Sequence, residues 1–255
     1  MRLKFCAVIT VLLFLTASLS MSEVLFCISK IAEEHAEENE SEEYYKKMAL
    51  LLHGTSEDGD CVMNNAFNKI VSPDFCFGVA GWIYIEDTCI DYPVMQEAGT
   101  SRGFYLDHRP DGKYASCGSL YIPAGDSIGS DNVIIYGHHM RNGSMFASLA
   151  SYRDKKWAND HRCISLITPD GVRTYMVTAV LVQSADRRSF RWEEYIDFTD
   201  NNEHIRYGDR AREESVIELD NKAVGLDGNT RYLSLVTCDY SVNNGRLAVI
   251  AVLCD

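Results

Sequence analysis

The chain has 255 residues, of which 46% are hydrophobic and 24% are charged, a composition typical of a globular protein rather than a disordered one. A formal net charge of −13 argues against nucleic acid as a partner, because phosphates require a basic surface. The nine cysteines include no Cys-x-x-Cys pair, which excludes zinc-ribbon and thioredoxin-type motifs, and the acidic residues form no calcium loop, so we predict no metal and no cofactor.

The N-terminus has the pattern of a membrane signal. Arg2 and Lys4 precede an apolar run over residues 5–19. Two interpretations stay open: a signal peptide cleaved near Ala17, or an uncleaved anchor that extends to Ile28. We favour the anchor and assign it residues 1–29. It predicts a single-pass protein of the cell membrane whose remaining residues lie outside the cytoplasm.

Residues 30–77 are predicted to form an N-terminal helical segment. Glu33–His53 begins with acidic residues and carries Lys46 and Lys47 late, a distribution that suits the helix dipole. We expect a loop over residues 54–60 and a short helix over residues 64–70.

From residue 78 to residue 255 the pattern changes to short β runs separated by turn residues, which predicts one β domain. About nine such runs occur at hairpin-like spacing, and they favour an antiparallel barrel or sandwich. A polar, aromatic helical insert over residues 189–215 interrupts them. The runs begin at residues 81, 90, 103, 118, 132, 163, 173, 231 and 246.

Cys238 stands at the end of the run that precedes the last strand. A cysteine attacks as the thiolate and needs a partner, usually a histidine, that takes its proton. Histidines occur at 35, 53, 108, 138, 139, 161 and 204. Two of them, His138 and His139, directly follow a buried-looking strand and Gly137, whereas 161 and 204 fall in polar segments that we expect to be exposed. Neighbouring side chains alternate in a strand, so one of this pair must point away from any site.

Arg246 follows Cys238 across the turn residues Asn243, Asn244 and Gly245. A hairpin would bring Arg246 beside the thiol, where its permanent charge could stabilise an oxyanion. The pattern alone leaves a common alternative open, in which Cys238 is a packed strand residue and Arg246 a surface arginine. Of the seven cysteines from Cys61 onward, most are expected to be buried free thiols, with one or two disulfides as the alternative.

Four blocks of the sequence resemble the sortases, the cysteine transpeptidases of Gram-positive surfaces, and most of all class B. The resemblance implies an eight-stranded sortase-type β-barrel with N-terminal helices and a helical insert before the cysteine-bearing strand. It also implies a catalytic trio of His138, rather than His139, with Cys238 and Arg246. The blocks are residues 81–96, 103–122, 132–149 and 234–251.

The resemblance also marks candidate substrate-binding residues. Thr237 matches the threonine that precedes the family's cysteine. Ser234 replaces the first threonine of that pattern, and Val236 stands where class B often has serine. Ser101-Arg102 replaces a common Asp-Asn pair, so we expect Arg102 to alter how the sorting signal is read.

The activity that the resemblance implies is cleavage of a C-terminal sorting signal, Asn-Pro-x-Thr-Asn-like, on secreted proteins. A thioester acyl-enzyme would then be resolved by an amine of a peptidoglycan cross-bridge or lipid-linked precursor. Two alternatives stay open at this point: a pilin-polymerising sortase, and a non-catalytic surface-binding domain.

Overall fold

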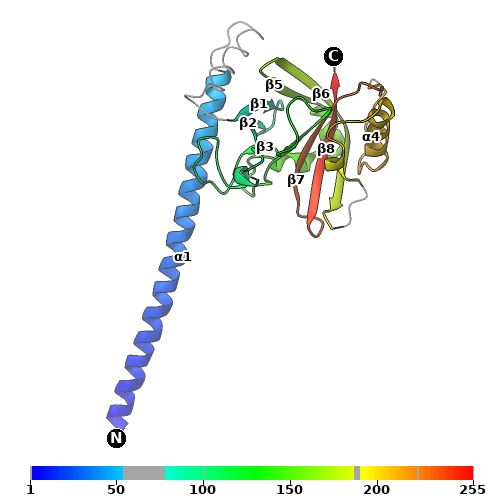
Figure 1. Cartoon of the computed structure of the whole chain (residues 1–255). Helices are drawn as coiled ribbons and strands as arrows, with labels where there is room; N and C mark the ends of the chain where they lie inside the picture. The colour runs from blue at the N-terminus through cyan, green and yellow to red at the C-terminus, as the bar shows by residue number, and fades with distance from the viewer. Residues whose placement is uncertain (1, 54–77, 101, 187–189, 223, 255) are drawn as a thin grey trace. The chain divides into compact units, whose positions relative to one another are not determined.

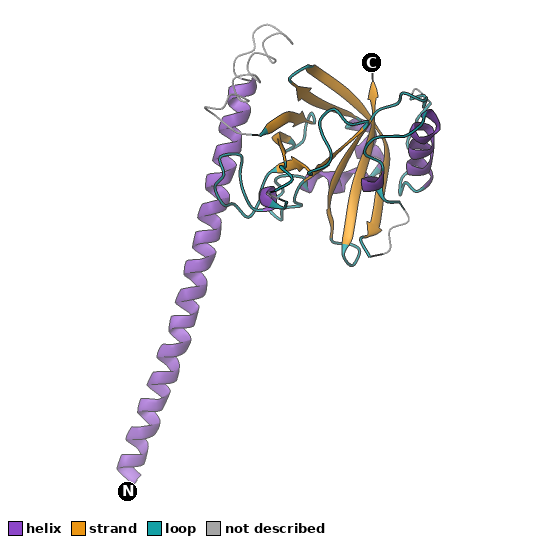
Figure 2. Ribbon diagram, viewed as in Figure 1, coloured by secondary structure: helices purple, strands orange, loops and turns teal. Residues whose placement is uncertain are grey.

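The computed structural model describes residues 2–53, 78–100, 102–186, 190–222 and 224–254, with side chains from residue 21 onward. It divides into two compact units, Met1–Glu43 and Tyr44–Asp255. The long helix α1 (Arg2–His53) runs through the boundary between them (Figures 1 and 2). The loop and short helix predicted between residues 54 and 70 lie outside the described residues. The predicted boundaries after residues 29 and 77 stay predictions.

The first unit corrects one prediction. Its described apolar side chains begin at Met21 and are interrupted by Glu23 and Lys30. A membrane crossing needs roughly 20 predominantly apolar residues. Across the part of the chain that the structure describes, no helix reaches the length and apolar character required. The predicted single-pass anchor, and the cell-membrane location that depended on it, are therefore wrong.

The second unit is built on a closed barrel of eight strands, as predicted (Figure 1). The strand order around the barrel is β1-β2-β3-β4-β7-β8-β6-β5. The expected purely antiparallel pairing is incomplete, because β2 with β3 and β4 with β7 pair in parallel. The strands are β1 (Val79–Tyr84), β2 (Asp91–Gln96), β3 (Leu120–Ile122), β4 (Asn132–Tyr136), β5 (Cys163–Thr168), β6 (Gly171–Ser184), β7 (Tyr232–Asp239) and β8 (Gly245–Cys254).

Alternating side chains give the barrel an interior core and a covered outer face. Leu233 and Leu235 of β7 belong to the interior cluster, whereas Tyr232 and Val236 belong to a second cluster that includes Tyr207 of helix α4 (Asn201–Glu213). This period-two division is what a closed β-sheet imposes on its strands. The outer face of β7 is therefore buried under α4 at the beginning of the strand.

The run that begins at Gly103 is not a strand. It forms the 3₁₀ helix η1 (Phe104–Leu106), entered through Gly103 at φ +80°. Phe104 and Leu106 are 37% and 45% exposed, so the apolar residues that suggested a strand do not pack into the barrel. A residue at positive φ fits a turn better than a ladder, which explains the difference.

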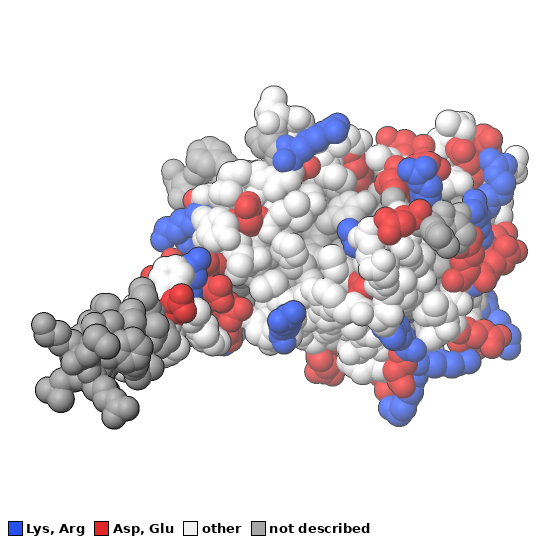
Figure 3. Space-filling model, turned by 90° about the horizontal axis from the view of Figure 1, so that it is seen from below, with Lys and Arg blue, Asp and Glu red and all other residues white. Residues whose placement is uncertain are grey.

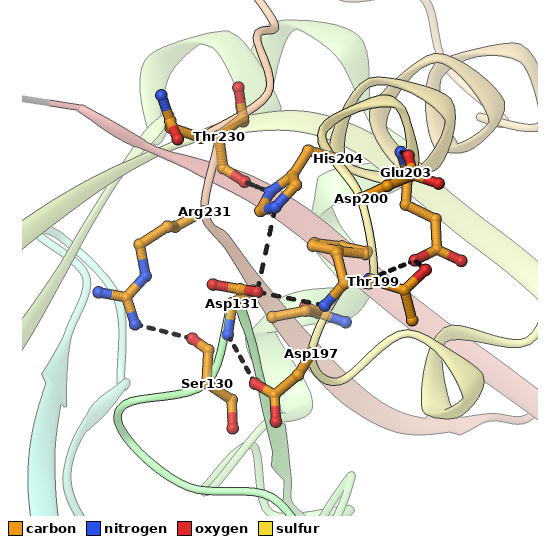
Figure 4. Close-up of polar contacts among 12 residues, drawn as sticks. Ser130, Asp131, Asp197, Thr199, Asp200, Glu203, His204, Thr230 and Arg231 are labelled. Atoms are coloured by element: carbon orange, nitrogen blue, oxygen red, sulfur yellow. Dashed lines mark hydrogen bonds and ion pairs between the residues drawn. The ribbon is translucent and has the colours of Figure 1, made fainter.

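The helical insert before β7 is present. It contains η3 (Trp192–Glu194) and α4 (Asn201–Glu213), whose N-cap Asp200 accepts from the backbone N–H groups of Asn202 and Glu203. A polar seam joins this insert to the barrel (Figure 4). In it, Asp131 Oδ2 accepts from the Phe198 N–H at 3.2 Å, and His204 Nδ1 bonds Thr230 O at 2.7 Å.

Shorter helical elements and the end of α1 complete this unit. Met48 and Leu52 of α1 pack with Trp82 of β1. The Tyr45 hydroxyl donates to Gly118 O at 2.6 Å and fixes the loop before β3. Between β4 and β5 lie η2 (Ala147–Arg153) and α3 (Lys155–Asp160).

Candidate active site

Cys238 and Arg246 are direct partners in the antiparallel pairing of β7 with β8. The turn between the two strands passes through Asn244 at φ +49°, a conformation that asparagine tolerates. The hairpin expected from the sequence is thus present. A direct cross-strand pair has its Cβ atoms about 4.5–5.5 Å apart, so the two side chains leave the sheet from neighbouring positions.

Both side chains belong to the outer face of the barrel. Val236 of β7 and Ala248 of β8 lie in the outer cluster, and Cys238 and Arg246 are each two residues away from them on the same strands. Cys238 is half-buried rather than enclosed. Helix α4 therefore covers the outer face of β7 at its beginning, and the thiol lies where that face opens to solvent.

His138 reaches the same end of the barrel from β4. The last pair between β4 and β7 is Tyr136 with Val236, and Gly137 N donates to Val236 O at 3.1 Å. His138 and Cys238 each come two residues after that pair. The strands run in parallel, so their ends, and the two residues that follow, lie at one edge of the barrel.

Glycine is required at position 137. A Cβ built there would lie 2.2 Å from Leu120 Cδ2 and 2.7 Å from Phe146 Cδ2. The backbone that leads into His138 thus packs directly against core side chains and leaves no room for a side chain at position 137.

The imidazole of His138 is oriented by η1. His138 Nε2 lies 2.7 Å from Leu106 O. A carbonyl oxygen only accepts, so Nε2 carries a hydrogen and Nδ1 is left to exchange protons in the neutral ring. Sequence analysis did not single out Leu106, because the contact uses its backbone carbonyl, which every residue type has.

His139 has a different environment. Its Nδ1 lies 3.0 Å from the backbone oxygen of Cys238, and its ring lies 5.0 Å from that of Tyr240. The Tyr240 hydroxyl donates to His139 O at 3.0 Å. The two adjacent histidines thus hold different partners, one in η1 and the other in the segment around the thiol.

The guanidinium of Arg246 bonds its own turn. Nη1 donates to Gly245 O at 2.9 Å and to Asn244 Oδ1 at 3.3 Å. On its other side Arg246 pairs with Gln183 of β6, whose side chain exchanges two hydrogen bonds with the backbone of Phe190. Gln183 was also missed by sequence reasoning, and it ties the start of the helical insert to the arginine.

Asp239 stabilises the turn that follows Cys238 through hydrogen bonds of its carboxylate. It is 3% exposed, and its carboxylate accepts from the Ser241 N–H at 2.8 Å and from Arg153 Nη1 at 2.9 Å. Burial would raise the pKa of Asp239, but the hydrogen bonds of Ser241 and the charge of Arg153 outweigh it and lower that pKa. Asp239 is thus held as a carboxylate directly after the cysteine.

The four predicted substrate-binding residues differ in access. Ser234 and Val236 are fully buried, Ser234 in a ring of hydrogen bonds with Asn132 and Tyr207. Thr237 is also buried, and its hydroxyl donates to Gly137 O at 2.8 Å. Arg102 alone is exposed, in the turn before η1. Contact of these residues with substrate stays a prediction. Of the four, Arg102 is the most accessible to a substrate, because its side chain is exposed.

The remaining histidines and cysteines differ from expectation in their burial. His204, expected to be exposed, is buried at 8% exposure in the seam of Figure 4. Among the cysteines that the structure describes, only Cys117 is buried, so the expectation of mostly buried thiols does not hold for them. In the part of the chain with described side chains, no group of three or more His, Cys, Asp or Glu could hold a metal ion.

The surface seen from below, toward the end where the β7–β8 turn lies, is largely uncharged in its middle (Figures 1 and 3). Acidic and basic side chains gather toward its margins.

Comparison with known proteins gives a consistent result. Residues 83–254 match the family model described as the Sortase domain. Over 176 residues the chain is 32% identical to the sortase B of Listeria monocytogenes, covering 67% of this chain and 68% of that protein. Over 177 residues it is 25% identical to the sortase B of Staphylococcus aureus, covering 68% and 69%.

Solved structures show the same fold. The Clostridium perfringens sortase B structure is similar with a TM-score of 0.62 and 27% identity, over 69% of this chain and 94% of that one. A Staphylococcus aureus sortase B–substrate complex has a TM-score of 0.71 at 22% identity, over 86% and 99% of the two chains.

Proposed function

The chain belongs to the sortase family and is a sortase B-type cysteine transpeptidase, and from that premise we propose which residues carry the reaction and what they act on. The proposed catalytic domain is residues 78–255, and its catalytic residues are His138, Cys238 and Arg246. The substrate is a secreted protein with a C-terminal sorting signal of the Asn-Pro-x-Thr-Asn type, and the acceptor is a cell-wall amine.

The first half-reaction breaks a peptide bond. The Cys238 thiolate attacks the carbonyl carbon that follows the threonine of the signal. Arg246 donates to the oxyanion that forms, and its charge persists at any working pH. As the C–N bond breaks, His138 as the imidazolium gives its proton to the leaving amine. The product is a thioester between Cys238 and the substrate.

The second half-reaction restores the enzyme. A neutral amine attacks the thioester carbonyl, and His138 accepts the proton that this amine loses. The C–S bond breaks, a new amide forms, and Cys238 leaves as the thiolate. Water can replace the amine, in which case the same steps release a carboxylic acid.

The observation that carries this assignment is the arrangement of three strand ends. Cys238 and Arg246 are cross-strand partners on one outer face, and His138 follows the strand that pairs with β7 on its other side. The bond from His138 Nε2 to Leu106 O supports the role of the imidazole, because it leaves Nδ1 to carry the proton in transit.

Arg102 is the proposed source of altered specificity. Its exposed cation precedes η1, and η1 contacts His138 through Leu106. A cation at this point favours substrates with a carboxylate or carbonyl near the start of the signal and disfavours those with a basic residue there.

The test uses the full chain and quenched fluorescent peptides. The panel holds Asn-Pro-x-Thr-Asn, Leu-Pro-x-Thr-Gly and variants at the first and last positions, each with and without an amine acceptor. We expect cleavage that depends on Cys238, a thioester that mass spectrometry detects, and loss of both in Cys238→Ala. Cleavage that survives in Cys238→Ala would overturn the assignment of the nucleophile.

A further inference from the structure

The β-ladder that aligns the two proposed catalytic strands ends before it reaches the catalytic residues. Its last pair is Tyr136 with Val236, followed by one backbone bond from Gly137 N to Val236 O. The relative position of the segments that carry His138 and Cys238 therefore depends on contacts beyond the ladder.

Two hydrogen bonds supply such contacts, and each segment donates one of them to the other. The first joins His139 Nδ1 with Cys238 O at 3.0 Å, and the second runs from the Tyr240 hydroxyl to His139 O at 3.0 Å. The donors come from opposite segments, and each bonds the backbone of the other. The two rings also contact each other at 5.0 Å between centroids.

Each bond acts one or two residues from a catalytic side chain. His139 adjoins His138, and its ring bonds the carbonyl of Cys238 itself. Because that carbonyl only accepts, His139 Nδ1 carries a hydrogen in both the neutral and the charged ring.

We propose that His139 and Tyr240 are positioning residues that set the distance between the imidazole of His138 and the thiol of Cys238. This inference rests on the proposed function in assigning those two groups to the reaction. It gives the second histidine of the pair a role that is separate from proton transfer. It also gives an exposed tyrosine a role in the site.

The variants remove one bond at a time from the full chain. Tyr240→Phe deletes only the hydroxyl of a side chain that is 70% exposed, so folding is not at risk. His139→Phe keeps a ring but removes the donor. His139→Asn keeps a donor, since its Nδ2 is as many bonds from the backbone as Nδ1 of histidine. Tyr114→Phe, at another exposed tyrosine, is the matched control.

Kinetics with the peptide that the wild type cleaves fastest give the first readout. We expect Tyr240→Phe and His139→Phe to lower kcat by about three- to tenfold, the range set by one lost hydrogen bond, with KM within about twofold. The double variant should be no slower than the slower single one, because the two bonds act as a unit. His139→Asn should recover most of kcat, and Tyr114→Phe should match the wild type.

Alkylation of Cys238 by iodoacetamide gives a second readout that needs no peptide. Mass spectrometry of the Cys238 peptide follows its rate, and we expect it to fall in His139→Phe and Tyr240→Phe but not in Tyr114→Phe. If peptides are cleaved while kcat and alkylation match the control, the inference fails and the proposed function stands. If no peptide is cleaved, the function fails, and the alkylation rates alone decide whether the two bonds position the thiol.

Discussion

Replacing Arg153 by methionine should destabilise the protein in a way that depends on pH. Arg153 donates to the buried carboxylate of Asp239, directly after Cys238, and holds its pKa low against the effect of burial. The methionine retains most of the aliphatic length and removes the cation. Asp239 keeps its bonds from Ser241 but loses its opposite charge.

The magnitude follows from the contacts. A hydrogen bond to a charged group contributes about 1.5–3 kcal/mol, but the Arg153 side chain is 43% exposed, and solvent screening reduces its share. We therefore expect a loss of about 1–2 kcal/mol in the free energy of unfolding at pH 7. A carboxyl with a lowered folded pKa stabilises the fold above its unfolded pKa and loses this contribution as pH falls through the folded pKa. The difference between variant and wild type should thus shrink as pH falls below the ordinary pKa of an aspartate, about 4.

Urea unfolding at pH 7 and pH 3 measures both values. Arg206→Met is the matched control, because Arg206 is 60% exposed and its contact with Asp200 is 3.7 Å long, so its loss should change stability by less than about 0.5 kcal/mol. An equal destabilisation of Arg153→Met at both pH values would refute the reasoning, since the effect would then come from packing and not from charge. Peptide cleavage at pH 7 should fall as well, because the turn after Cys238 loses a support.

Burial raises the pKa of Asp126 to about 6, so the protonated acid stabilises the folded state at low pH. This stabilisation, about 2–3 kcal/mol, is lost as pH rises from about 4 to about 7. Asp126→Asn should flatten this loss in urea titrations. Gly137→Ala should cost about 1–3 kcal/mol by overpacking against Leu120 and Phe146 and should reduce peptide cleavage further than the fall in Tm explains, because His138 moves. Tyr207→Phe breaks the ring of hydrogen bonds with Ser234 and should lower stability by about 1–2 kcal/mol while leaving kcat at 25 °C unchanged; a large fall in kcat without loss of stability would contradict a purely structural role.

The barrel was predictable because its strands are short, apolar and separated by turn residues. Periodicity does not carry strand direction, however, so the parallel pairs β2–β3 and β4–β7 could not be read from it. The run at Gly103 misled for a related reason. Phe104 and Leu106 have the apolar character of a strand, and only the structure shows that they face solvent.

The candidate site was predictable where side chains carry the chemistry. Cys238 and Arg246 could be paired from a turn and a spacing, and the parallel pairing of β4 with β7 adds His138. What the sequence could not provide were the backbone partners, Leu106 O for one histidine and Cys238 O for the other. Alternation on β7 does put Ser234 and Val236 on the face of Cys238, but nothing in the pattern indicates that α4 covers them.

The parallel pairing of β4 with β7 also bears on how the enzyme becomes active. These neighbours are joined by 95 residues of chain, from Tyr136 to Tyr232, that include two further barrel strands and the helical insert. Closing so long a loop is entropically costly, and non-local pairing of this kind slows folding. The imidazole and the thiol can meet only after that closure, so a chain with a formed helix and hairpins would still be chemically inert. Catalytic competence should then appear in refolding as a late event, after most of the secondary structure has formed.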